Sequence, residues 1–329
     1  MATALRLLQQ GMFIPHPSLT EENLSDQTGK VHIVTGGYSG IGHELVKILY
    51  SKNATVYSAG RNRDNALESI ESIKRAYPNS SGKLHFLSLD LSNFSTIKKS
   101  AEDFLDKETR LDVLTNNAGI MVPPKGSRDA QGHELQMGTN CLGPFLFTSF
   151  LIPILKKTAA SSPPGTVRIT WAASSAIELS PKGGVEFDLD GAVQIHSDPQ
   201  KDYCQSKAGN IFLAFETARR YGDDGIISVA WNPGNLQSGL YRHMGQFPKW
   251  VMDKTWLHPP VFGAYTILYA GWSGEITGES NGAYIIPWGR FGKLRADIKT
   301  RRLGAEEDGG SGVAGRFWEW CVRSTKSYT

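Results

Sequence analysis

The 329-residue sequence has few of the features that mark secreted, metal-binding or membrane-spanning proteins. Its three cysteines, Cys141, Cys204 and Cys321, lack the spacing of a zinc site, and its histidines form no HExxH or HxH pattern. We therefore expect reduced thiols, a cytoplasmic location and no metal ion. The longest apolar stretches, Phe145–Leu155 and Val261–Trp272, fall short of the ~18 residues of a transmembrane helix, so no transmembrane segment is predicted. Peripheral association with a membrane remains an open alternative.

The sequence also lacks an excess of charge of either sign. The 35 Lys and Arg against 32 Asp and Glu leave a formal net charge of +3, whereas a protein that follows nucleic-acid phosphates needs a concentrated basic face. Nucleic acid is therefore not expected as a partner. One basic cluster lies within residues 290–302, and we interpret it either as a solvated surface segment or as a contact for phosphate or acidic lipid.

Glycine is abundant: 35 of the 329 residues are glycine, about a tenth of the chain, whereas the usual share is ~7%. Length alone suggests two domains of about 150 residues. Between residues 30 and 290, however, short β-branched runs alternate with longer helical stretches, which indicates βαβ units and a parallel sheet covered on both faces. We therefore predict a single α/β domain, a doubly wound Rossmann fold with a parallel seven-stranded sheet. The predicted strands are Val31–Thr35, Ala54–Ala59, Leu84–Leu89, Leu111–Thr115, Val167–Trp171, Ile226–Trp231 and Ala283–Ile286.

Three segments lie outside this alternation. Residues 1–29 are expected to form an N-terminal lead-in, and residues 291–329 a C-terminal tail whose tryptophans dock on the protein's own core, on a partner or on a bilayer. Residues 235–257 are long and rich in aromatic side chains, so they are predicted to pack as core or to form a substrate lid. The predicted helices between the strands are Gly42–Ser51, Arg63–Tyr77, Ser95–Lys107, Glu134–Ala159 and Asp202–Tyr221.

A glycine turn joins the first predicted strand to the first helix. Residues 35–42 read TGGYSGIG, and backbone N–H groups at such a turn bind pyrophosphate at the helix N-terminus. The spacing is not the general GxGxxG but TGxxxGxG. It resembles the short-chain dehydrogenase/reductase family, in which this turn holds a nicotinamide dinucleotide.

The end of the second strand indicates which dinucleotide is bound. NAD enzymes place an acid there for the ribose 2′-hydroxyl, whereas an arginine accommodates a 2′-phosphate. Gly60 stands in the place of the acid and Arg61 follows it, so the cofactor is predicted to be NADP(H). Tyr38 occupies a position at which NADP users of the family often have a basic residue. Recognition of the phosphate is therefore expected to depend mainly on Arg61, with Asn62 or Arg63 beside it.

Later motifs resemble the same family in the expected order. Asp90 and Leu91 follow the third strand, where the family contacts adenine, residues 116–119 read NNAG, and residues 233–238 are similar to its Pro-Gly cofactor loop. The resemblance extends over residues 30–290. The implied cofactor contacts are Gly36, Tyr38, Ser39, Gly40, Ile41, Gly42, Arg61, Asn62, Asp90, Leu91, Asn117, Ala118, Gly119, Tyr203, Lys207, Pro233, Gly234, Leu236 and Ser238.

The resemblance also implies a catalytic set of Asn140, Ser174, Tyr203 and Lys207, with Ser175 as the alternative serine. Tyr203 and Lys207 form a YxxxK motif, and positions four apart share one face of a helix. The cation of Lys207 would lower the pKa of the Tyr203 phenol from near 10, so that the tyrosine acts as general acid and base. Ser174 would hydrogen-bond the substrate oxygen, and Asn140, by analogy with the family, would hold a water of a proton relay.

These observations predict an oxidoreductase that transfers a hydride between NADP(H) and a ketone, aldehyde or secondary alcohol of a bulky apolar substrate. The long interval between the catalytic serine and tyrosine resembles retinol dehydrogenase-like enzymes, and the C-terminal sequence resembles reductases of fungal metabolism, including secondary metabolism. A small-molecule substrate is the expected partner, and a homo-oligomer is an open alternative. The candidate substrate contacts are Met121, Ile177, Tyr241 and Met244.

Two other functions fit these residues less well. A non-catalytic NADP-binding or scaffold protein could share the fold, although loss of Tyr203 or Lys207 would be its expected sign and both are present. A sugar epimerase or dehydratase is disfavoured, because those relatives have TGxxGxxG and a longer substrate domain.

Overall fold

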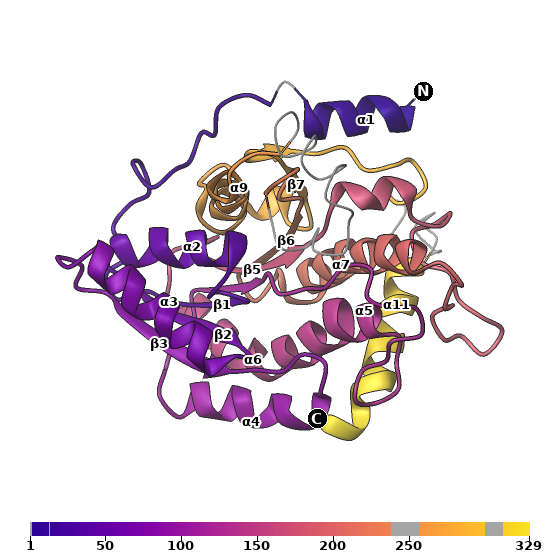
Figure 1. Ribbon diagram of the computed structural model, residues 1–329, viewed down its shortest axis with the longest axis horizontal. Coiled ribbons are helices and arrows are strands. Elements are labelled where there is room, and N and C mark those ends of the chain that lie inside the picture. The colour runs from indigo at the N-terminus through magenta and orange to yellow at the C-terminus, as the bar shows by residue number, and fades with distance from the viewer. Residues whose placement is uncertain (1, 13, 238–256, 300–311) are drawn as a thin grey trace.

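The computed structural model describes residues 2–12, 14–237, 257–299 and 312–329, and eight strands within these residues form one sheet (Figure 1). The strand order is β3-β2-β1-β4-β5-β6-β7-β8. Neighbouring strands from β3 to β7 are parallel, and β8 is antiparallel to β7. The strands are β1 (Val31–Thr35), β2 (Thr55–Gly60), β3 (Lys83–Ser88), β4 (Val113–Asn116), β5 (Val167–Ala172), β6 (Ile226–Trp231), β7 (Tyr284–Ile286) and β8 (Arg290–Phe291).

The order of the strands confirms the predicted doubly wound α/β fold. The chain runs outward from β1 to β3 and then returns to the other side of β1 at β4, which places a topological switch point between β1 and β4. All seven predicted strands are present with small shifts at their ends. The eighth strand was not predicted. It follows a turn in which Gly289 has a φ of 92°, so that the chain folds back along β7.

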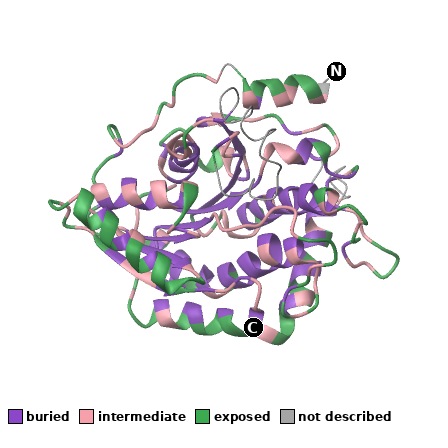
Figure 2. Cartoon of the chain, viewed as in Figure 1, coloured by how far each residue is buried: buried purple, intermediate pink, exposed green. Residues whose placement is uncertain are grey.

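Helices cover both faces of the sheet, and this explains why the strands are continuous apolar runs. Every residue of β1, β4, β5 and β6 is buried, whereas the edge strand β3 has exposed residues at both ends (Figure 2). One core contains side chains of α2, α3 and α9, and the other contains those of α4, α6, α7 and α11. These helices are α2 (Gly40–Ser51), α3 (Arg63–Ala76), α4 (Phe94–Leu105), α6 (Gly143–Ala160), α7 (Pro199–Tyr221), α9 (Pro260–Trp272) and α11 (Val313–Thr325).

The predicted helix Glu134–Ala159 is interrupted. It consists of the short α5 (Leu135–Met137), a π-helical turn η1 (Gly138–Leu142) and α6. By length and composition, Leu135–Ala160 is the one segment of the described residues that could cross a membrane, but 72% of its most apolar window is buried inside the protein. It packs against α4 and the sheet, which is the position of a core helix.

The C-terminal tail contains α11, which packs against α7 (Figure 1). Phe317 is fully buried, and its ring lies 5.9 Å from that of Phe212 in α7. Trp318 meets Phe145 of α6 edge to face at 4.9 Å. Of the three interpretations of the tryptophans, docking on the protein's own core is therefore the one that the structure shows.

The N-terminal lead-in begins with α1 (Ala2–Gly11), which lies across the carboxyl end of the sheet near β7 (Figure 1). The remaining short helical turns are η2 (Ser175–Leu179), η4 (Gly278–Ser280) and η6 (Lys326–Tyr328).

Candidate active site

The glycine turn between β1 and α2 has the backbone geometry of a phosphate-binding loop. Gly36 and Gly40 have φ angles of 67° and 53°, which residues with a side chain rarely adopt. A Cβ atom on Gly42 would overlap the carbonyl of Gly36, whereas no atom lies within 4 Å of the Cβ position on Gly40. In this fully described turn, the Ser39 side chain makes no capping hydrogen bond to α2. The helix N-terminus therefore faces a space that fits the pyrophosphate of a nicotinamide dinucleotide.

The end of β2 lies beside this turn. The ring of Tyr38 lies directly over Gly60, so that a Cβ atom on Gly60 would overlap it. The Tyr38 hydroxyl accepts a hydrogen bond from the Asn62 backbone N–H at 3.3 Å. The Asn62 side chain caps α3, because its Oδ1 accepts the N–H of Asn65 at 3.0 Å. Exposed Arg61 and the positive N-terminal end of α3 thus lie together next to the glycine turn.

The NNAG segment joins the carboxyl ends of β1 and β4. The backbone N–H groups of Asn117 and Ala118 both donate to Thr35 Oγ1 at 2.9 Å, and Asn117 Nδ2 donates to the Thr35 carbonyl at 2.7 Å. Half-buried Asp90 and buried Leu91 follow β3. These predicted cofactor residues therefore lie at the edge of the sheet where α/β proteins bind ligands.

The Pro-Gly loop after β6 reaches the same region. Gly234 has a φ of 85°. A Cβ atom on Gly263 of α9 would overlap Leu236 and lie 2.7 Å from Ile41. The side chains of these two predicted cofactor residues therefore both lie against α9 at Gly263. Leu236 also forms an isolated parallel bridge with His258. The glycine turn and the Pro-Gly loop are thus adjacent.

The buried helix α7 carries the YxxxK pair. Lys207 Nζ lies 5.7 Å from the centre of the Tyr203 ring and donates a hydrogen bond to the Ala172 carbonyl at the end of β5, at 2.9 Å. Asn210 Nδ2 donates to the same carbonyl at 2.8 Å. Burial lowers the pKa of Lys207 to about 8. The lysine still carries its charge at neutral pH, and an adjacent cation favours the tyrosinate form of Tyr203.

Asn140 and Lys207 come together around Gly119. A Cβ atom on Gly119 would lie 3.0 Å from Asn140 Oδ1 and 3.4 Å from Lys207 Nζ, so glycine permits this close approach. Asn140 lies in the π-helical turn, a feature often found at functional sites. Its Oδ1 accepts the Ile120 N–H at 2.9 Å, and its Nδ2 donates to Ser206 Oγ at 3.0 Å. The Asn140 side chain therefore links the NNAG segment to α7.

Ser174 lies two residues after β5, at the start of η2, which packs against α7. Its Oγ accepts the N–H of Ala176 at 3.1 Å, which leaves its proton available to another acceptor. Ser175 is the first residue of η2 itself. Ser174 therefore caps η2, and η2 packs against α7, the helix that carries Tyr203.

Of the candidate substrate contacts, Met121 and Ile177 lie within the described residues. Met121 is half-buried just after the NNAG segment. Ile177 is fully buried in the core, so its side chain lines no open surface in this conformation. The predicted contacts Ser238, Tyr241 and Met244, and with them most of the predicted lid, lie outside the described residues.

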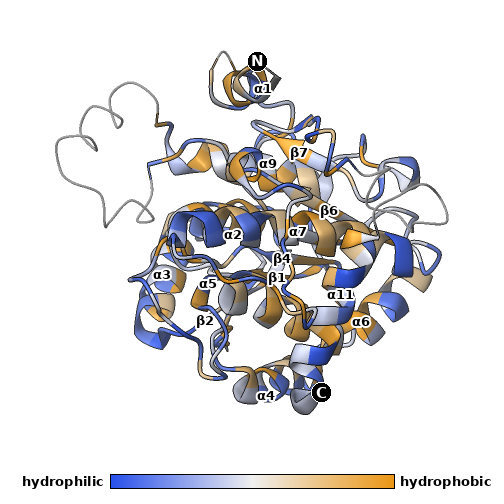
Figure 3. Ribbon diagram, turned by 90° about the vertical axis from the view of Figure 1, so that its right-hand side faces the viewer, coloured by the Kyte–Doolittle hydropathy of each residue, from blue (hydrophilic) through white to orange (hydrophobic). Residues whose placement is uncertain are grey.

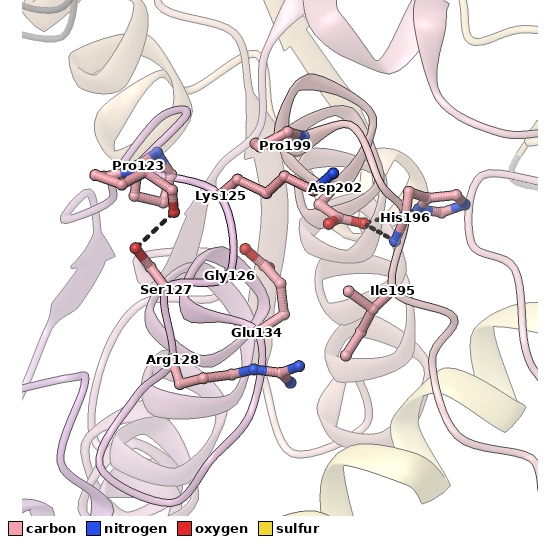
Figure 4. A pocket seen from close by; sticks show the side chains of 11 residues that line it. Pro123, Lys125, Gly126, Ser127, Arg128, Glu134, Ile195, His196, Pro199 and Asp202 are labelled. Atoms are coloured by element: carbon pink, nitrogen blue, oxygen red, sulfur yellow. Dashed lines mark hydrogen bonds and ion pairs between the residues drawn. The ribbon is translucent and has the colours of Figure 1, made fainter.

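A cavity of about 200 Å³ opens at the N-terminal end of α7 (Figure 4). Its wall includes Glu134, His196 and Asp202, which directly precedes Tyr203. His196 Nδ1 lies 2.7 Å from Asp202 Oδ1, and its Nε2 lies 2.8 Å from Glu186 Oε2. Burial raises the pKa of Glu134, opposed by the Met137 N–H that it accepts. These residues belong to no motif and come from separate segments of the chain, with Asp202 in α7 itself, so no local sequence pattern identifies them.

The geometry defines a dinucleotide-binding oxidoreductase fold, and comparisons with known proteins agree. A family model described as short chain dehydrogenase matches residues 30–183. A short-chain dehydrogenase/reductase from Phomopsis amygdali is 45% identical over 323 residues, which cover 96% of each chain. Another, from Emericella nidulans, is 45% identical over 315 residues, covering 95% of this chain and 97% of the relative. The protein belongs to the short-chain dehydrogenase/reductase family and is an oxidoreductase that binds a nicotinamide cofactor.

Solved structures agree on the fold. A crystal structure of a putative uncharacterized protein from Mycobacterium paratuberculosis has a TM-score of 0.65 at 24% identity and covers 94% of this chain and 97% of that one. The RhlG/NADP active-site complex of Pseudomonas aeruginosa has a TM-score of 0.59 at 24% identity, covering 77% and 94%. A 3-ketoacyl-(acyl-carrier-protein) reductase from Brucella melitensis, complexed with NADH, has a TM-score of 0.57 at 23% identity, covering 76% and 95%.

Proposed function

We propose that the protein interconverts a ketone or aldehyde and the corresponding alcohol of a bulky apolar substrate, with NADP(H) as its cofactor. The observation that carries this proposal is the buried Lys207 ammonium, 5.7 Å from the centre of the Tyr203 ring and next to Gly119 of the NNAG segment. The apolar and aromatic-rich sequence of residues 238–256 supports a bulky substrate.

Each polar group has a role in this reaction. NADP(H) supplies or accepts the hydride when it is bound. Tyr203 exchanges a proton with the substrate oxygen, and the charge of Lys207 stabilises the tyrosinate that remains. Ser174 donates a hydrogen bond to the same oxygen, where negative charge develops. Asn140 keeps the NNAG segment and α7 at a fixed distance through its bonds to Ile120 and Ser206.

The test is a screen for NADPH oxidation over aldehydes and ketones of increasing size and apolar area. We expect turnover to increase from small to bulky apolar carbonyls and to be absent from the Tyr203→Phe variant. Binding of NADPH without turnover of any carbonyl or alcohol would contradict the proposal and support a non-catalytic role.

The proposed preference for NADP(H) depends on charge. Gly60 supplies no carboxylate that would bind the ribose 2′-hydroxyl and repel a 2′-phosphate. Arg61 and Arg63 flank Asn62 at the positive end of α3. Arg63 also lies over the ring of Phe86, at 5.8 Å from its centre. Because Arg63 is engaged with this ring, Arg61 is assigned the 2′-phosphate.

Replacing Arg61 tests this assignment. Arg61→Ala should weaken NADPH binding by roughly 10- to 100-fold, because a charge-assisted hydrogen bond is lost, and should change NADH binding little. The two dissociation constants can be measured by quenching of tryptophan fluorescence. Arg75→Ala is the matched control, since Arg75 is an exposed arginine in the last turn of the same helix. An equal loss of affinity for both cofactors would show that Arg61 does not recognise the phosphate.

The choice between the two serines has a separate test. Ser174→Ala should lower kcat by about 10²-fold, because a preorganised donor to the developing charge is removed. Ser175→Ala should stay within about twofold of wild-type kcat, since its neighbour retains that role. Steady-state kinetics of both variants with one substrate decide the matter. The reverse order of effects would assign the role to Ser175.

Two further proposals concern the setting of the reaction. We assign the protein to fungal-type secondary metabolism, which the fungal origin of its relatives in Phomopsis amygdali and Emericella nidulans supports. We also assign it to the cytoplasm, where thiols such as the buried, unpaired Cys141, Cys204 and Cys321 stay reduced.

A further inference from the structure

The N-terminal helix α1 is held to the body of the protein by its polar side chains. Leu5 and Leu8 point outward and are 58% and 50% exposed, whereas Gln10 is 4% exposed. Apolar and polar residues both appear on this helix in Figure 3. An ordinary surface helix buries its apolar face and exposes its polar one. Here Leu7 is only half-buried and Gln10 is the most buried of the described residues, so polar contacts add to a limited burial of apolar area in holding α1.

Gln10 contacts the segments that follow β6 and form β7. Its Oε1 accepts a hydrogen bond from Asn232 Nδ2 at 2.9 Å and another from the Tyr284 hydroxyl at 2.9 Å. Asn232 opens the Pro-Gly loop, and its own Oδ1 accepts the Gly234 N–H at 3.1 Å. The Asn232 side chain therefore connects Gln10 to the loop that the proposed function assigns to the cofactor.

Arg6 contacts the segment that carries the catalytic serine. Its Nε lies 2.9 Å from both carboxylate oxygens of Glu178 in η2, and the Glu178 side chain is completely buried. Burial raises the pKa of Glu178, and the charge of Arg6 opposes this effect. The Tyr284 hydroxyl that binds Gln10 also lies 3.3 Å from the carbonyl of Ser174. α1 thus contacts η2 directly through Arg6 and is linked to the Ser174 carbonyl through Tyr284.

Two backbone contacts complete the attachment. Arg290 of β8 donates a hydrogen bond to the Gln9 carbonyl at 2.9 Å. A Cβ atom on Gly11 would lie 3.0 Å from Asn235 Nδ2, so the end of α1 abuts the Pro-Gly loop. The helix therefore spans from η2 to the Pro-Gly loop, the two segments that border the reacting atoms in the proposed function.

We propose that α1 is a positioning element of the active site. Gln10 holds the Pro-Gly loop and Arg6 holds η2, and together they fix the positions of these two segments relative to each other. This inference rests on the proposed function for the roles of those two segments. Neither residue touches the reacting atoms. Each acts through a neighbour, and a displacement of well under 1 Å at a donor such as Ser174 is enough to reduce the rate.

Replacing Gln10 by methionine tests this role, because methionine has a similar volume but lacks the amide acceptor. Gln10→Met should lower kcat by about tenfold, since two hydrogen bonds that position the site are lost. The NADPH dissociation constant should rise about threefold, because the Pro-Gly loop is less well ordered. Gln9→Met is the matched control, since the neighbouring glutamine side chain is exposed and only its backbone carbonyl is used. Its kcat and NADPH affinity should equal those of the wild type.

Hydrogen–deuterium exchange of the cofactor-free protein provides a measurement that does not depend on activity. In Gln10→Met, exchange should increase in residues 174–180 and 232–237 together and stay unchanged in β1 and β4. A double-mutant cycle with Tyr284→Phe should show non-additive effects on kcat, because both changes remove the same hydrogen bond. Unchanged exchange in both segments, or additive effects, would overturn the proposal. If the wild type reduces no carbonyl, the proposed function fails, while the exchange data still decide whether α1 holds the two segments.

Discussion

Tyr203→Phe is expected to lower kcat by on the order of 10³-fold while NADPH affinity stays close to that of the wild type. The change removes only the phenolic oxygen, so the ring keeps its place in the buried face of α7 and Lys207 keeps its bond to the Ala172 carbonyl. What is lost is the hydroxyl that, in the proposed function, exchanges a proton with the substrate oxygen. Single-turnover kinetics with saturating NADPH, together with titration of NADPH fluorescence, separate the chemical step from binding.

A matched control for this variant lies on the same helix. Tyr221 is the last residue of α7, and its ring centre lies 6.4 Å from that of Trp318, far along the helix from Tyr203. Tyr221→Phe should leave both kcat and the NADPH dissociation constant within about twofold of the wild type, because surface hydroxyls contribute little. Substantial residual activity in Tyr203→Phe would remove the tyrosine from the role of general acid and base.

Phe317→Ala is expected to reduce the free energy of unfolding by about 3–5 kcal/mol, the usual loss when a fully buried aromatic ring is removed. The Phe317 ring fills the space between α11 and α7 so closely that a Cβ atom on Gly209 would lie 2.7 Å from it. Its ring centre also lies 5.5 Å from that of Trp320. The cavity left behind would border Gly209, two residues after Lys207, and so it would loosen the helix that carries Tyr203 and Lys207.

Urea unfolding followed by circular dichroism measures this loss. Glu319→Ala is the control, because Glu319 lies in the same helix but is exposed and forms only a surface ion pair with Arg220 at 3.2 Å. Its effect should be at most ~1 kcal/mol. A loss of less than ~1 kcal/mol in Phe317→Ala would show that α11 does not stabilise the packing around α7.

The strands and the order of the site residues could be predicted because their signals are local. A strand buried on both faces is a continuous apolar run, as in β5 and β6. The glycine turn has a fixed spacing because Gly36 has a positive φ and Gly42 leaves no room for a side chain. The YxxxK pair was recognisable for a similar reason, since its spacing follows from one turn of a helix.

The remaining features depend on contacts between distant parts of the chain. Gln10 binds Asn232 and Tyr284, which lie 222 and 274 residues away in sequence, and no local pattern reports such partners. The π-helical turn at Asn140 was not predicted, because it lies between α5 and α6 without a break in the helical chain. The tryptophans of α11 were open to three interpretations, since an apolar helical face shows that something covers it but does not show what does.

The bridge between Leu236 and His258 joins the chain on either side of residues 238–256. Gln237 N donates to the His258 carbonyl at 2.9 Å, and His258 N donates to the Asn235 carbonyl at 2.9 Å, so the two points at which the described chain borders this segment lie together. When the ends of a segment are already joined, each doubling of its length adds only about 0.6 kcal/mol of closure entropy. We therefore expect changes in the number of residues between these two points to leave the sheet and the positions of Tyr203 and Lys207 as they are.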